Sequence, residues 1–238
     1  MTTASAPRPR PFPAWPTLGA ACLVVATAFV VAIVAGIPAV IIFGTPKNPG
    51  DPGTNVIEAA FYLGGAAVLI PLLEALAQRP LPALGLHRLH ARDWGFVAGG
   101  IITVLLVQFL YQFALGAIHQ QNHIQAGFEH FRVPSKAAAA MVLINGALIA
   151  PIVEELFFRG LIFNALAIRA PVFVAALLSG ALFGMAHGDP VLAPALAIFG
   201  LVQAGIYRAT GNLVVPMIVH AVNNAIFLSL MIAIPGFH

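Results

Sequence analysis

The sequence predicts an all-α polytopic integral membrane protein, a bundle of seven to eight transmembrane helices. Of its 238 residues, 60% are hydrophobic and only 8% are charged, whereas about 25% of the residues in a soluble domain are charged. Apolar runs of about 20 residues recur along the chain, and each is long enough to cross roughly 30 Å of hydrocarbon as a helix. Because lipid cannot satisfy open backbone groups and no alternating ten-residue pattern is present, helices are expected in place of a barrel.

The first 16 residues differ in composition from the rest of the chain. Arg8 and Arg10 stand there among five prolines, a composition typical of a disordered tail. The apolar run that follows is longer than the core of a cleaved signal and shows no convincing cleavage site, so we expect an uncleaved anchor. The predicted organisation is a cytoplasmic tail over residues 1–16 and one transmembrane helical domain over 17–238.

Hydropathy and length define seven candidate spans. They cover about 17–43, 56–78, 94–118, 137–168, 171–187, 191–209 and 213–235. The fourth is too long for one straight crossing, so we expect it to tilt, to break near Pro151, or to extend beyond the bilayer. An eighth, shorter helix is compatible with this excess length.

The basic residues favour a cytoplasmic N-terminus. Segments on one side of the predicted spans carry Arg8, Arg10, Arg79, Arg88, Arg92, Arg169 and Arg208. By the positive-inside rule these segments are cytoplasmic, although Arg132 and Lys136 on the other side weaken the contrast. Seven spans would place the C-terminus outside and eight would place it inside. No basic patch interleaved with aromatic residues suggests a nucleic-acid partner.

Three ionisable residues lie close together within the apolar fourth span. They are Glu154, Glu155 and Arg159, and charges at such a depth tend to pair or to mark a functional site. On a helix, Glu155 and Arg159 share a face, whereas Glu154 points elsewhere. We therefore expect an ion pair between Glu155 and Arg159, which leaves Glu154 free to face a cavity as a general base. A purely structural charge cluster is the alternative.

Two further motifs fall in later spans. Phe183 and His187 lie four residues apart in the fifth span, and His220 and Asn224 lie four apart in the seventh. Each pair therefore occupies one helical stripe. A lone membrane histidine usually forms an interhelical hydrogen bond, but a glutamate, two histidines and an asparagine on three spans together favour a catalytic site.

The residue inventory separates several kinds of intramembrane hydrolysis. The chain has no H-E-x-x-H sequence, which a typical zinc protease requires. Ser179 and Ser229 do not lie in a G-x-S-x-G elbow, and Asp189 stands alone where an aspartyl mechanism needs two aspartates. The remaining scheme is a water activated by glutamate, with histidine and asparagine partners.

These motifs resemble a known family. E-E-x-x-x-R from Glu154, F-x-x-x-H from Phe183 and H-x-x-x-N from His220 are similar, in order and spacing, to the three signatures of the CPBP family, which is also called Abi. That family includes CAAX prenyl proteases and bacteriocin-processing enzymes. The motifs span about 70 residues, all within the segment 137–235.

The resemblance implies an intramembrane endopeptidase of about eight helices that acts on a membrane-associated or prenylated peptide or protein. The expected location is the cytoplasmic (inner) membrane of a bacterium. Glu154 would activate water with help from His187, and His220 with Asn224 would stabilise the oxyanion. The residues that would hold this catalytic group in position, without acting on the substrate themselves, are Glu155, Arg159 and Phe183. Asn223 is a less suitable substitute for Asn224.

Cofactor and function retain alternatives at this stage. A reaction without a metal is favoured, but Glu154, His187 and His220 could offer three ligands to zinc with an open fourth position. A non-catalytic role, such as bacteriocin immunity or a membrane scaffold, is a second class of function. A proton-coupled carrier is a third, and the absence of an evident internal repeat disfavours it.

Other polar residues have simpler interpretations. Glu58 and Glu74 are expected to extend toward the two membrane interfaces. Gln108, Gln112 and Gln203 are expected to form interhelical hydrogen bonds. The loop histidines match no metal-site spacing; they are His119, His123 and His130.

Overall fold

The computed structural model describes residues 18–45, 48–77, 85–118 and 131–234. The predicted tail over residues 1–16 and the three loop histidines lie outside these ranges. The described residues form seven helical rods. They are α1 (Leu18–Phe43), α2 (Pro52–Ala77), α3 (Ala91–Ala117), a continuous rod from Lys136 to Ala167, α8 (Val172–Ala186), α9 (Ala193–Thr210) and α10 (Val214–Ala233).

The chain is a polytopic membrane protein. Five helices of the described part are long and apolar enough to cross a bilayer; they are Cys22–Phe43, Pro52–Leu72, Ala91–Ala117, Lys136–Ala167 and Val214–Ala233. Helix α8 is apolar but has 15 residues, which at 1.5 Å per residue reach only about 22 Å. The predicted positions of all seven helices agree with the structure. Of these helices, five are long and apolar enough to cross a membrane.

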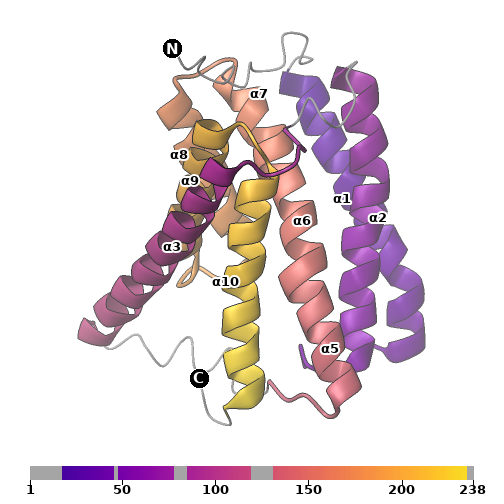
Figure 1. The fold of residues 1–238 in the computed structure, drawn as a ribbon. Coiled ribbons are helices and arrows are strands. Elements are labelled where there is room, and N and C mark those ends of the chain that lie inside the picture. The colour runs from indigo at the N-terminus through magenta and orange to yellow at the C-terminus, as the bar shows by residue number, and fades with distance from the viewer. Residues whose placement is uncertain (1–17, 46–47, 78–84, 119–130, 235–238) are drawn as a thin grey trace.

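Helices α1 and α2 form an antiparallel pair on one side of the molecule (Figure 1). The long fourth rod and α10 run through the centre, α3 crosses obliquely, and α8 and α9 pack together on the far side from α1 and α2. An apolar core joins α3, the fourth rod, α8, α9 and α10, and includes Phe158, Phe183, Phe199 and Val219. The site described below borders this core.

The fourth rod is continuous and contains two wide, π-helical stretches. Its parts are α5 (Lys136–Ile144), η2 (Asn145–Ile149), α6 (Ala150–Glu155), η3 (Leu156–Phe163) and α7 (Asn164–Ala167). One of the three alternatives expected for this long span, a break near Pro151, is therefore wrong. Pro151 is the second residue of α6 and is separated from η2 by Ala150 alone. A wide turn relieves the ring clash and the missing N–H that proline brings to a helix interior.

One polar contact joins the α1–α2 pair to the centre of the molecule near one end of α2. The side-chain amide of Asn145, at the start of η2, donates to the carbonyl oxygen of Asn55 at 2.6 Å. Both residues are buried. Since a buried polar group must be paired, this bond fixes the position of α2 along the axis of the fourth rod.

Helices α8 and α9 approach each other closely at two glycines. A Cβ atom on Gly180 would lie 2.5 Å from the carbonyl oxygen of Ala197, and one on Gly200 would lie 2.7 Å from the Cα of Gly180. Both obstacles are backbone atoms, which cannot rotate away. The approach brings the Gly200 carbonyl to the buried Arg159 side chain.

Gly180→Ala is expected to lower the free energy of unfolding by about 1–3 kcal/mol, because the added methyl group forces α8 and α9 apart. Thermal unfolding in detergent measures the effect. Gly205→Ala is the matched control in α9, because a Cβ there meets nothing within 4 Å, and it should be neutral or slightly stabilising. Equal midpoints for the two variants would contradict the close approach.

Candidate active site

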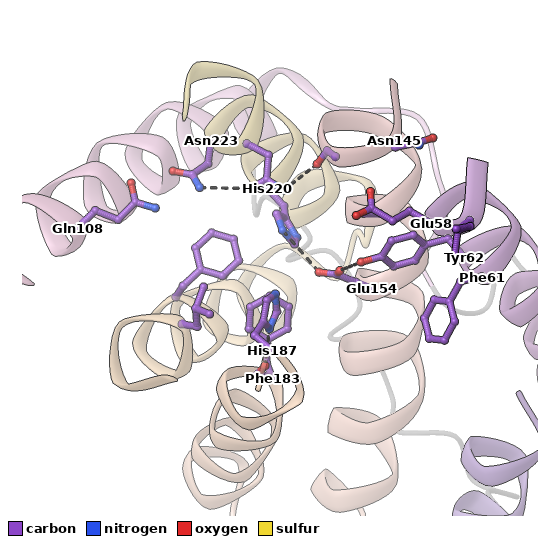
Figure 2. A pocket seen from close by; sticks show the side chains of 16 residues that line it. Glu58, Phe61, Tyr62, Gln108, Asn145, Glu154, Phe183, His187, His220 and Asn223 are labelled. Atoms are coloured by element: carbon purple, nitrogen blue, oxygen red, sulfur yellow. Dashed lines mark hydrogen bonds and ion pairs between the residues drawn. The ribbon is translucent and has the colours of Figure 1, made fainter. Parts of the chain in front are cut away.

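Glu154, His187, His220 and Asn224 line a single cavity of about 420 Å³. Its walls come from α2, α3, the fourth rod, α8, α9 and α10. Figure 2 shows the glutamate and the two histidines in the middle of the cavity, with Tyr62 and Glu58 on one side and Gln108 and Asn223 on the other. The structure thus brings together the four residues that the sequence selected from three separate helices.

Glu154 has a different partner at each carboxylate oxygen. Its Oε1 accepts a hydrogen bond from the Tyr62 hydroxyl at 2.7 Å, and its Oε2 lies 3.8 Å from Nε2 of His220. The side chain is 14% exposed, so it is largely desolvated yet reachable from the cavity. A carboxylate in such a setting can take a proton from a small polar molecule that enters.

Glu155 points away from the cavity into a buried network, as its position on the helix predicts. Its Oε1 lies 3.0 Å from Arg159 Nη1 and 3.0 Å from Nδ1 of His220, and accepts a longer bond from Gln203 at 3.4 Å. The predicted ion pair between Glu155 and Arg159 is confirmed. Gln203 also donates to the Pro216 carbonyl at 2.7 Å, which confirms its interhelical role.

Arg159 is fully buried and has partners beyond Glu155. Its Nη2 donates to the Gly200 carbonyl at 3.0 Å, and the guanidinium carbon lies 4.9 Å from the centre of the Phe183 ring. A cation above an aromatic face is stabilised by the charge distribution of the ring. Phe183 therefore packs against the charge network and also borders the cavity.

His187 is the residue that caps the C-terminal end of α8. Its Nδ1 lies 2.8 Å from the Phe183 carbonyl, and because a carbonyl only accepts, Nδ1 carries a hydrogen. In the neutral ring, Nε2 is then an acceptor. The imidazole leans against the Phe183 ring with centroids 4.7 Å apart, which limits its rotation.

His220 is buried and held by aromatic rings on two sides. Its ring centroid lies 4.8 Å from that of Phe199 and 5.8 Å from that of Phe183, both edge-on. Because the Glu155 carboxylate at Nδ1 is an acceptor, Nδ1–H donates to it. Nε2 is left facing Glu154.

The two asparagines of α10 differ in their contacts. Asn224 donates from Nδ2 to the Gly146 carbonyl in η2 at 2.8 Å, so one of its two N–H groups is occupied. Asn223 is buried, and among the described residues its Oδ1 has no hydrogen-bond partner. Both line the cavity, but only Asn224 shares a helical stripe with His220 at a spacing of four.

Sequence reasoning missed one wall of this cavity. Asn55, Glu58 and Tyr62 form a polar stripe on α2 at spacings of three and four, which is the signal that could have identified it. Glu58, which the sequence analysis assigns only to an interface, also lines the cavity. Gln108 lines the opposite wall, whereas Glu74 is exposed on α2.

The described side chains are not gathered into a metal-binding group in this arrangement. Among the described residues, no group of three or more His, Cys, Asp or Glu side chains lies close enough together to hold one. The Nδ1 atoms of His187 and His220 face the Phe183 carbonyl and the Glu155 carboxylate, so Nε2 is the atom of each ring left for other partners.

The geometry agrees with comparisons to known proteins. Residues 136–226, which hold all three motifs, match the family model described as type II CAAX prenyl endopeptidase Rce1-like. A curated relative is the "Putative membrane peptidase YdiL" of Bacillus subtilis (strain 168), 32% identical over 87 residues. The match covers 37% of this chain and 36% of the relative, so the chain spans about a third of the length of that relative. No solved structure matches the chain significantly.

Proposed function

We propose that this protein is an intramembrane endopeptidase in which Glu154 activates water to hydrolyse a peptide bond. One observation carries the proposal: Glu154 and His220 face each other at 3.8 Å within a cavity that His187 and Asn224 also line. The chemistry needs a base, room for a peptide group and donors for the developing oxyanion. The base and the donors lie in the family-matched region, and residues of α2 and α3 complete the cavity.

The proton path begins and ends at Glu154. Oε1 is occupied by the Tyr62 hydroxyl, so Oε2 takes the proton as water oxygen bonds to the substrate carbonyl carbon. That proton then passes to the leaving nitrogen as the C–N bond breaks. His187 assists by accepting from the same water at Nε2, since its Nδ1–H is bound to the Phe183 carbonyl.

His220 is suited to stabilise the oxyanion through Nε2–H. With Nδ1–H bound to Glu155, a hydrogen at Nε2 makes the ring an imidazolium. Glu154 and Glu155 as carboxylates then balance Arg159 and the imidazolium, so the group has no net charge. When Glu154 gains its proton the substrate oxygen becomes negative, and the balance is kept, which matters where desolvation penalises net charge.

Asn224 adds the second donor to the oxyanion. One N–H of its amide is bound to the Gly146 carbonyl, which leaves the other N–H and fixes the amide plane. Removing one such donor from an oxyanion site typically costs about 10²–10³ in rate. Asn223 lines the same wall but is not needed for this step.

The substrate class follows from the setting of the site. The cavity lies among apolar helices, which suits a peptide segment that reaches the site at or within a bilayer, on a membrane-associated or prenylated protein. We place the protein in the cytoplasmic membrane of a bacterium, with its N-terminus inside and with seven or eight spans. The family name supports a prenylated substrate as one form.

The test compares membranes of a deletion strain that carries wild type or Glu154→Gln, with all new protein termini mapped by mass spectrometry. Termini that occur only with wild type support a peptidase and name its substrate. If no terminus depends on Glu154 and both forms restore the strain equally, the peptidase proposal fails and a non-catalytic role, such as immunity, replaces it.

A further inference from the structure

Tyr62 reaches the candidate site from outside the family-matched region. It lies on α2, 74 residues before the first matched residue, and its hydroxyl is 2.7 Å from Oε1 of Glu154. The bond is drawn in Figure 2, where the phenol ring enters from the α2 side and meets the carboxylate end-on. Since an ionised carboxylate only accepts, the phenol is the donor.

The phenol ring of Tyr62 is held in place by its own helix. Asn55 lies seven residues earlier on the same face of α2 and accepts the buried bond from Asn145. Phe61 contacts the Tyr62 ring edge-on, with centroids 5.7 Å apart, and in turn meets Phe29 of α1 at 5.9 Å. The position and the direction of the Tyr62 hydroxyl relative to Glu154 are therefore fixed.

Tyr62 also lies where two cavities meet. A second, largely apolar cavity of about 310 Å³ lies between α1, α2 and the fourth rod. Phe61, Tyr62, Glu154 and His187 line both cavities. The hydrogen bond between Tyr62 and Glu154 therefore lies at the boundary between the two cavities. Oε1 of Glu154 takes part in this bond, and Oε2 faces His220.

We propose that Tyr62 is a positioning residue for Glu154. The inference rests on the proposed function and adds a residue of α2 to the candidate active site. By donating to Oε1, Tyr62 leaves Oε2 as the oxygen that can hold the attacking water, and it does so on the His220 side. A hydrogen bond to a charged acceptor is about twice as strong as a neutral one, so the phenol holds this carboxylate oxygen firmly.

Tyr62 keeps its own hydrogen through the cycle. Oε2 gains the water proton and later loses it to the leaving nitrogen, while the phenol donates to Oε1 in both states. The residue need not touch substrate, so its loss should change kcat more than KM.

The test is Tyr62→Phe in the full chain, assayed with a fluorogenic peptide that spans the cleavage site found by terminus mapping. We expect kcat to fall about tenfold or more, in line with the loss of one hydrogen bond to a charged group, and KM to stay within about twofold. An unchanged kcat, or a rise in KM alone, overturns the proposal.

Tyr111→Phe is the matched control. Its hydroxyl bonds to the Val191 carbonyl, and Tyr111 does not line the cavity. We expect kcat within about twofold of wild type; a loss equal to that of Tyr62→Phe would make the effect structural. Activity in Glu154→Gln would refute the proposed function itself, whereas inactive Glu154→Gln beside fully active Tyr62→Phe refutes the role of Tyr62 alone.

A second measurement needs neither substrate nor the Phe variant. 3-Fluorotyrosine at position 62 keeps the ring and the hydroxyl but makes the phenol a stronger donor. The infrared carboxyl band of Glu154, assigned by its loss in Glu154→Gln, should shift in the fluorinated protein. A band that does not move overturns the positioning role.

Discussion

Glu154→Gln is expected to abolish peptide hydrolysis and leave the protein folded. The amide keeps the size of the carboxylate and still accepts from Tyr62 at its carbonyl oxygen, but it cannot take a proton from water. General bases contribute about 10²–10⁴ in rate, so kcat should fall by at least that factor. The measurement is cleavage of the peptide identified by terminus mapping, with purified protein returned to lipid vesicles.

Glu74→Gln provides the control for this prediction. Glu74 is an exposed glutamate on α2 and does not line the cavity, so its variant should cleave at the wild-type rate. Thermal unfolding of both variants should match wild type within a few degrees. Normal cleavage by Glu154→Gln would refute the mechanism, and a large loss of thermal stability in that variant would show that the carboxylate mainly supports the fold.

Arg159→Met should produce the largest loss of stability among changes at this site. It removes the cation that lies 3.0 Å from Glu155 and leaves that fully buried carboxylate with His220 as its one remaining partner of opposite charge among the described residues. Breaking a buried pair from one side costs about 3–5 kcal/mol. The expected result is a lower unfolding midpoint and a reduced yield of folded protein, measured by thermal unfolding in detergent.

The double variant Glu155→Gln with Arg159→Met tests the cause of that loss. With both charges gone, no unpaired ion is buried, and residue 155 can still accept from His220. The double variant should therefore be more stable than Arg159→Met alone, with a coupling of about 1–3 kcal/mol. If it were less stable than the single variant, shape and packing around Arg159 would explain the effect, and charge would not.

Much of the architecture follows from hydropathy and helical spacing. Apolar runs place all seven helices within a few residues of their observed positions, because each run must satisfy its backbone internally in lipid. The spacing of four between Glu155 and Arg159 predicts their ion pair, which is confirmed. The same rule predicts that Glu154 faces elsewhere, and it lines the cavity.

The local form of the fourth rod could not be predicted this way. A proline inside a helix can kink or break it, which makes a break near Pro151 one of three alternatives for this span, but the rod continues because η2 widens the helix just before it. Whether a helix takes a wide turn depends on its neighbours. Here Asn145 and Gly146 of η2 bond to Asn55 of α2 and Asn224 of α10, contacts that a single-span pattern does not contain.

Hydrogen bonds between helices that are far apart in the sequence could not be predicted either. Tyr62 and Glu154 are separated by 92 residues, and no spacing rule connects positions so far apart. The bond of His220 to Glu155, 65 residues apart, was missed for the same reason. Polar stripes on separate helices can be found from sequence, but which stripes face each other is decided by packing.

The wide turns of the fourth rod also affect the direction in which the side chains that follow them point. Each residue advances an α-helix by about 100 degrees, and a π-helical turn takes up an extra residue. Asn145 and Gly146 are anchored before η2 ends, and Glu154 follows it. Deleting one residue within Ala147–Ile149 would leave an ordinary α-helical turn and keep Glu154 facing Tyr62 and His220. Deleting one residue of the ordinary α-helix just before Glu154 would instead turn it by about 100 degrees, away from both. The direction of the carboxylate is thus set by residue count as much as by residue identity.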